Sequence, residues 1–152
     1  MKYLMLTFFF LSACVFHPMY TNQKRTDVCV SPIPNEEGYQ LRQQLQQHFP
    51  NTDHCVYTLA VETPKYSFSD QSISDKDFIT MQRINAITSY TLKDENKNVI
   101  FKNTVSANGS SAVTSNPYAS VVASQKTSEN LTSLLAEQIV LHVSAFLDEE
   151  AQ

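Results

Sequence analysis

Glycine is scarce in this chain of 152 residues, which contains only Gly38 and Gly109. The dinucleotide-binding fingerprint needs three closely spaced glycines, and the phosphate-binding P-loop needs two glycines ahead of a lysine. Neither pattern can be written anywhere in this sequence. The sequence therefore argues against an enzyme that uses a nucleotide.

Other signatures of catalysis and metal binding are also missing. None of the serines lies in a Gly-x-Ser-x-Gly turn, which presents the nucleophile in many hydrolases. The four histidines have no spacing typical of metal ligands; they are His17, His48, His54 and His142. Acidic pairs such as Glu36-Glu37 occur in expected turns and helix starts, where carboxylates are commonly solvated. We expect neither an enzyme nor a bound metal or other cofactor.

Basic residues are outnumbered by acidic ones, with 11 Lys+Arg against 15 Asp+Glu and a formal net charge of −4. Proteins that bind nucleic acid usually present a basic surface to the phosphates. Nucleic acid is therefore not an expected partner. An anionic ligand would have to be bound by a local basic patch, because the overall field of the protein is negative.

The N-terminal apolar run is too short to cross a membrane permanently. It extends from Leu4 to Leu11 behind the positive Lys2, whereas a spanning helix needs roughly 20 apolar residues. This pattern predicts a signal peptide over residues 1–13. The run ends in Leu11-Ser12-Ala13-Cys14, which has the form of a lipobox, so we expect cleavage before Cys14 and a diacylglyceryl group on its thiol. The alternative is a plain signal peptide or a buried strand with an incidental cysteine.

Lipidation at Cys14 predicts a protein anchored to the periplasmic face of a membrane, because two or more acyl chains hold a protein stably. Val15 follows the cysteine where enteric-type sorting would require an aspartate for the inner membrane, so resemblance to that sorting rule implies the outer membrane. Residues 14–27 have no sustained periodicity and are predicted to be a lipidated tether. One domain is expected over residues 28–147. Residues 148–152 are expected to fray, because acidic side chains are unfavourable at a helix C-terminus.

Two more cysteines, Cys29 and Cys55, remain in the mature chain. In an oxidising compartment an even pair can form a disulfide. Two buried thiols that pack as small apolar side chains are the alternative. The sequence does not show whether the strand-like segments around the two cysteines are adjacent, so both alternatives stay open.

Hydrophobic periodicity predicts an α+β fold. Leu41, Leu45 and Phe49 recur at intervals of four in a helix that Asn35 is expected to cap. We predict strands at 27–33, 55–68, 78–92 and 99–105, helices at 39–49 and 119–147, and loops at 69–77 and 108–117. The last two strands are joined by the polar turn 93–98 and are expected to form a hairpin. The order β-α-β-β-β-α predicts a two-layer sandwich, in which two helices cover a mixed sheet of about four strands.

The whole pattern resembles the lipopolysaccharide-assembly lipoprotein LptE in its alphaproteobacterial form. The segments that carry the resemblance run along nearly the entire mature chain: Leu11-Ser12-Ala13-Cys14, Phe16-His17-Pro18-Met19-Tyr20, 28–34, Leu41-Arg42-Gln43-Gln44-Leu45, Tyr57-Thr58-Leu59, Arg83, Ala86, 90–94, Asn116-Pro117-Tyr118-Ala119 and Leu135-Ala136. The lipobox with Phe-x-Pro-x-Tyr is the most specific of these. Val15 departs from the family pattern, in which glycine is usual at this position.

The resemblance implies a protein that plugs the β-barrel of the outer-membrane protein LptD, helps that barrel to assemble, and assists the delivery of lipopolysaccharide to the cell surface. Members of the family bind lipopolysaccharide through basic residues. We therefore expect Lys65, Lys76 or Lys126 to pair with its phosphates, while Arg83 matches a family position. The rival interpretation is an auxiliary lipoprotein of an ABC-type lipid transport system, and a periplasmic hydrolase is a third class.

Overall fold

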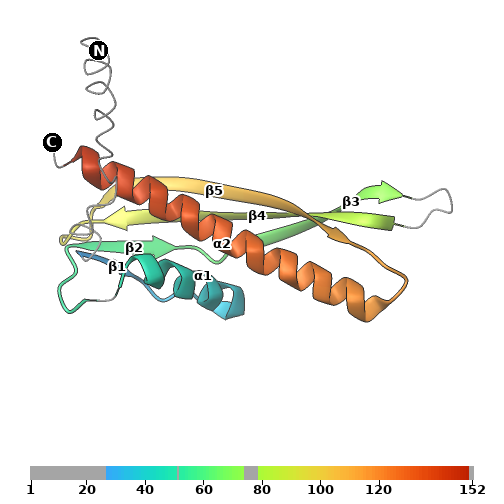
Figure 1. The fold of residues 1–152 in the computed structure, drawn as a ribbon. Coiled ribbons are helices and arrows are strands. Elements are labelled where there is room, and N and C mark those ends of the chain that lie inside the picture. The colour runs from blue at the N-terminus through green and yellow to red at the C-terminus, as the bar shows by residue number, and fades with distance from the viewer. Residues whose placement is uncertain (1–26, 51, 74–78, 151–152) are drawn as a thin grey trace, which may run out of the picture.

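The structure is a computed structural model that describes residues 27–50, 52–73 and 79–150. The elements along the chain are β1 (Val28–Val30), α1 (Asn35–His48), β2 (Tyr57–Val61), β3 (Lys65–Ile73), β4 (Ile79–Lys93), β5 (Val99–Ala112) and α2 (Pro117–Glu149). Figure 1 shows both helices on one side of an elongated sheet. The predicted α+β fold is confirmed, with five strands where about four were expected.

The fifth strand arises because one predicted strand is broken into two. On one side of β4, the short β2 pairs with Tyr90–Lys93 and β3 pairs with the N-terminal part of the same strand, so β2 and β3 lie end to end. Pro64 lies between them, and proline has no N–H to donate to a neighbouring strand. The hydroxyl of the buried Thr88 instead donates to the Glu62 carbonyl at the break, at 2.7 Å. The prediction of one continuous strand over 55–68 is therefore wrong.

The remaining pairings complete the sheet. Strand β5 pairs antiparallel with β4 along nearly its whole length, which confirms the predicted hairpin. Strand β1 is a short edge strand and runs parallel to β2. Residues 69–73 and 108–112 were expected in loops but belong to β3 and β5. Both segments consist mostly of polar residues and lack an apolar period, yet their backbones continue the ladder with β4.

Helix α1 buries Leu41 and Leu45, with Phe49 buried directly after its end, as the four-residue interval predicted. Its beginning differs from the prediction. Asn35 is already the first helical residue, has a φ of 67° and makes no side-chain capping bond. Asparagine adopts this left-handed conformation more readily than most residues, so its role here is to turn the chain after Pro34.

Helix α2 begins at an asparagine cap, because the Asn116 side chain accepts from the backbone N–H groups of Tyr118 and Ala119. The helix is long and apolar enough to cross a membrane by length and composition, with a mean hydropathy of 1.2 over its most apolar window. Of that window, 44% is buried, and a core helix passes the same test. The helix includes Asp148 and Glu149, so the fraying expected over 148–152 stays a prediction.

The buried apolar residues occupy only part of the space between the helices and the sheet. They stop at Ile84 on β4, at Ala107 on β5 and at Leu131 on α2. We call this region, with β1, β2, α1 and the C-terminal half of α2, the core end. The distal end consists of residues 79–83 of β4, 109–112 of β5 and 117–130 of α2. No residue of α2 before Leu131 is fully buried.

Candidate functional site

The sheet face opposite the helices is not covered by any other part of the described chain. Along β4 the even-numbered positions from Ile84 to Leu92 are buried under the helices, while the odd-numbered positions from Met81 to Lys93 remain at least partly exposed. The strand register brings further polar side chains to this uncovered face; they are Thr58, Ser67, Ser69, Thr104, Ser106, Asn108 and Ser110. The result is a broad polar surface, as is usual for the face of an antiparallel sheet that is exposed to water.

Four basic residues lie on this uncovered face, and we call them the basic row. They come from β3, β4 and β5 and comprise Lys65, Arg83, Lys93 and Lys102. The register places one acidic residue, Glu62, on the same face. Lys93 and Lys102 are near one another, because Lys102 pairs with Thr91, two positions from Lys93. Arg83 is ten positions from Lys93 on β4, about 34 Å at about 3.4 Å per residue, which is well beyond the Debye length of about 8 Å. Among the described residues, the face thus carries more basic than acidic side chains, on a chain whose net charge is −4.

The three lysines expected to bind an anionic ligand do not form one site. Lys65 is exposed at the beginning of β3 and belongs to the basic row. Lys126 is on α2, in the other layer, where its Nζ lies 3.2 Å from Glu129 Oε2 in an exposed ion pair. Lys76 lies outside the described residues. Of the two expected lysines that the structure describes, only Lys65 shares a face with other basic residues.

Sequence reasoning missed most of the basic row. Arg83 was noted for its place in a family pattern, and neither Lys93 nor Lys102 was singled out. These residues are separated along the chain and meet only through the register of β4 with β2 and β5. The alternation of each strand could have placed them on the exposed face. Lys93 and Lys102 each stand an odd number of positions from buried residues of their own strands, so their side chains point away from the core.

Cys29 and Cys55 form a disulfide, with their Cα atoms 5.6 Å apart. Of the two alternatives that the sequence left open, the structure has the bridge. Cys29 lies in β1 opposite Thr58 of β2, and Cys55 lies two residues before that strand. The bond therefore fixes β1 beside β2 and closes a segment that contains α1. Within residues 27–50, 52–73 and 79–150, no three His, Cys, Asp or Glu side chains are grouped as metal ligands.

A polar cluster lies at the other margin of the core. The Tyr90 hydroxyl is 3.1 Å from His142 Nδ1, and the Asn103 side chain reaches the same nitrogen at 3.4 Å. Burial raises the pKa of the Tyr90 phenol to about 12, against the opposing effect of its hydrogen bond with Asn103. A neutral phenol at physiological pH acts as a hydrogen-bonding group, so this cluster joins β4, β5 and α2.

The predicted lipidation site and its surroundings cannot be placed in this geometry. Cys14, the signal peptide over residues 1–13 and most of the tether over residues 14–27 lie outside the described residues. The first described residue, Asp27, adjoins β1 at the core end of the sheet.

The architecture defined by these elements is shared with bacterial lipoproteins of known structure. Rare lipoprotein B from Shewanella oneidensis superimposes with a TM-score of 0.67 at 10% sequence identity, covering 84% of this chain and 98% of that one. A lipoprotein from Caulobacter crescentus gives 0.65 at 18% identity, with 84% and 95% covered. A minor lipoprotein from Acinetobacter baumannii gives 0.60 at 19% identity, with 78% and 91% covered.

These likenesses show a common fold, extending over nearly the full length of the matched lipoproteins. No family model and no curated protein sequence matches the chain. The class that the fold defines is thus an α+β sandwich found in bacterial lipoproteins, one of which is a rare lipoprotein B.

Proposed function

We propose that this chain is an outer-membrane lipoprotein of the LptE type, anchored through Cys14, that plugs the β-barrel of an LptD-like partner and assists lipopolysaccharide transport to the cell surface. The fold shared with bacterial lipoproteins supports the class. The lipobox at residues 11–14 supports the anchor.

The uncovered sheet face is the observation that carries the plug. Ser, Thr and Asn side chains of the adjacent strands β3, β4 and β5 project from this face. Ile87, an apolar residue at its centre, is 46% exposed. The lumen of a membrane β-barrel is polar, with interior-facing residues that alternate with lipid-facing ones. A rigid sheet with a broad polar face can lie against such a wall, provided that the wall supplies acceptors or acidic partners for the basic residues on that face.

The basic row supports the second part of the proposal. Lipopolysaccharide carries phosphates, and lysine or arginine bind phosphates through charge-assisted hydrogen bonds. Lys65, Arg83, Lys93 and Lys102 offer such groups on one face, and none of them forms an ion pair in the described part of the chain. Lys126 is already paired with Glu129 and lies in the other layer, so it serves as a control and not as part of this surface.

The plug is tested by affinity capture of the tagged, detergent-solubilised lipoprotein. A photo-crosslinking residue replaces Ser89 or Thr104 on the uncovered face, and a matched variant carries it at the exposed Glu137 on α2. We expect a large outer-membrane barrel to be captured in near-equal amount and to crosslink from the uncovered face. Capture of inner-membrane transporter subunits alone would favour the rival auxiliary lipoprotein, and capture of neither would reject the plug.

Lipid binding is tested by reversing charge. The triple variant Lys65→Glu, Arg83→Glu and Lys102→Glu is expected to bind purified lipopolysaccharide about tenfold more weakly, since each exposed ion pair contributes up to about 1 kcal/mol. The control Lys126→Glu should bind as the unmodified protein does. An unchanged affinity of the triple variant would remove the basic row from the proposal.

A further inference from the structure

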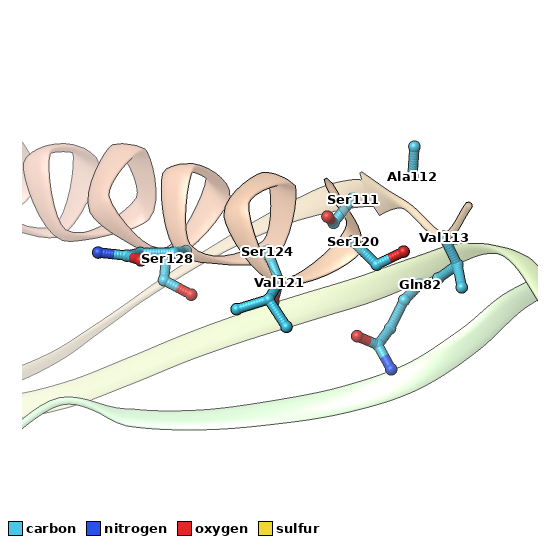
Figure 2. A pocket seen from close by; sticks show the side chains of 9 residues that line it. Gln82, Ser111, Ala112, Val113, Ser120, Val121, Ser124 and Ser128 are labelled. Atoms are coloured by element: carbon cyan, nitrogen blue, oxygen red, sulfur yellow. The ribbon is translucent and has the colours of Figure 1, made fainter. Parts of the chain in front are cut away.

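A groove of about 440 Å³ lies at the distal end, between the first turns of α2 and the ends of β4 and β5. Nine residues line it: Gln82, Ser111, Ala112, Val113, Ser120, Val121, Ser124, Gln125 and Ser128. Figure 2 shows Val121, Ser124 and Ser128 projecting from the helix toward the strands. The volume falls within the range of roughly 300 to 1,000 Å³ that is usual for small-molecule sites.

Small side chains keep this space unfilled. At the inner end of the groove the helix approaches β5 closely at Gly109. A Cβ atom at this position would lie only 3.1 Å from Thr127 Cγ2. On the distal side of this contact, the facing positions are Ser111 on β5 and Ser120 and Ser124 on α2, while Ser128 lines the groove beside the contact. The core end has leucine, isoleucine or valine at corresponding helix-facing positions. The groove is thus bounded by a tight contact on one side and is open at the distal end.

The Ser111 side chain, which lines the groove, has an unsatisfied hydrogen-bonding group. Ser111 is only 3% exposed, and its Oγ has no hydrogen-bond partner in the described structure. The register places it on the helix-facing side of β5, opposite Gln82 of β4, where both residues line the groove. A buried hydroxyl without a partner is costly, so most such groups in folded proteins are paired. A ligand that supplies an acceptor would satisfy it if the Ser111 side chain turns from its buried position toward the groove.

The chemistry of the lining narrows the class of ligand. None of the nine lining residues is ionisable, so the groove cannot neutralise a charge. Val113, Val121 and Ala112 supply apolar wall, and Val121 is itself 63% exposed beside the groove. An elongated apolar group with one uncharged acceptor therefore fits better than a phosphate, a carboxylate or a cation.

We propose that this groove binds one acyl chain, and that the Ser111 hydroxyl donates a hydrogen bond to the ester or amide carbonyl of that chain. The proposal rests on the groove alone and does not depend on the barrel partner. The basic row is on the opposite face of the sheet, so the two surfaces contact different parts of a lipid or different molecules.

The test uses the mature chain, residues 14–152, with Cys14→Ala so that no lipid or detergent is present. Monolauroyl glycerol, a neutral probe with a twelve-carbon chain and an ester carbonyl, is titrated while backbone amide NMR shifts are recorded. We expect saturable shifts confined to Val113, Val121 and Ser124 and their neighbours. Glycerol and the six-carbon monohexanoyl glycerol should produce little or no change. Shifts elsewhere, or equal binding of the short probe, would overturn the proposal.

Variants then separate the groove from the rest of α2. Ser124→Phe fills the groove and should reduce affinity for monolauroyl glycerol at least tenfold, whereas Ala145→Phe adds the same ring on an exposed part of the helix and should change nothing. Ser111→Ala should lower the affinity about fivefold, the effect of one hydrogen bond. It should leave binding of the ether analogue 1-dodecyl glycerol, which lacks the carbonyl, nearly unchanged. An equal loss for both probes would contradict the role of Ser111, and equal effects of the two Phe variants would contradict the site.

Discussion

The core end and the distal end of this molecule use the same sheet and the same helix, but they pack them differently. At the core end, large apolar residues such as Leu59, Tyr90 and Leu135 are almost completely buried between the layers. At the distal end, the facing residues are serines, and Val121 and Tyr118 are exposed on the helix. Figure 1 shows α2 continuing over both regions without interruption. The comparison separates the part of the fold that supplies stability from a part that remains available for contacts.

The largest expected effect is a truncation in the core end. Leu59→Ala should lower the free energy of unfolding by about 2 to 5 kcal/mol, because Leu59 is 0% exposed and its loss leaves a cavity. Val121→Ala in the distal end should change it by less than about 0.5 kcal/mol. Urea denaturation followed by circular dichroism measures both. Comparable losses at the two positions would show that the ends do not differ in this way.

Removing the disulfide should have the next largest effect. Replacing both Cys29 and Cys55 by alanine is expected to lower stability by about 3 kcal/mol, because the bridge restricts a loop of 26 residues in the unfolded chain. Addition of a reductant to the unmodified protein should produce a similar loss, with no further effect on the double variant. A double variant as stable as the oxidised protein would show that packing alone holds β1 beside β2.

A smaller effect of opposite sign is expected at the distal end. Ser111→Val removes a buried hydroxyl that lacks a partner and should stabilise the protein by about 1 kcal/mol. Ser106→Val, on the exposed face of the same strand, controls for the general preference of valine for strands. Thermal unfolding of the two variants provides the comparison. A gain no larger at position 111 than at position 106 would argue that the hydroxyl carries no cost.

The effect that is smallest at neutral pH concerns the titration of Tyr90. Burial raises the pKa of Tyr90 from 10.0 to about 12, so the folded state retains a proton that the unfolded state releases. The resulting contribution to the free energy of unfolding is fully present below pH 10 and is lost as the pH rises from about 10 to 12. Tyr90→Phe should therefore make stability fall less steeply over this interval, as measured by urea denaturation at a series of pH values. Lysine titration is common to both proteins and cancels in the comparison.

The sequence was sufficient for the fold class, because alternating and four-residue periods report on burial directly. Leu41, Leu45 and Phe49 defined α1 for this reason. The same signal failed at residues 69–73 and 108–112, where the strands pair through their backbones and carry polar side chains. The bridge between Cys29 and Cys55 required the parallel register of β1 and β2, which no local pattern contains.

The candidate sites were harder to predict for two different reasons. The basic row depends on pairings between distant segments, so Lys93 and Lys102 are neighbours only in the folded sheet. The groove exists because the residues that line it have small side chains. A serine such as Ser124 gives the same sequence signal whether it lines a groove or a solvated helix face. Of the expected ligand-binding lysines, Lys65 alone is placed with other cations in the described part of the chain.

The direction in which β1 begins has a consequence for how the molecule stands on its membrane. Val28 enters the sheet beside Tyr57, level with the C-terminal end of β4, so the anchor proposed at Cys14 would join the fold at the core end. From Lys93 to Gln82 the strand extends about 37 Å, at about 3.4 Å per residue. The groove therefore lies at the opposite end of β4 from the point where the described chain begins, a separation comparable to the roughly 30 Å thickness of a bilayer's hydrocarbon core. Under the proposed anchoring at Cys14, an acyl chain in this groove would lie at the end of the sheet that is farther from the attachment of the tether.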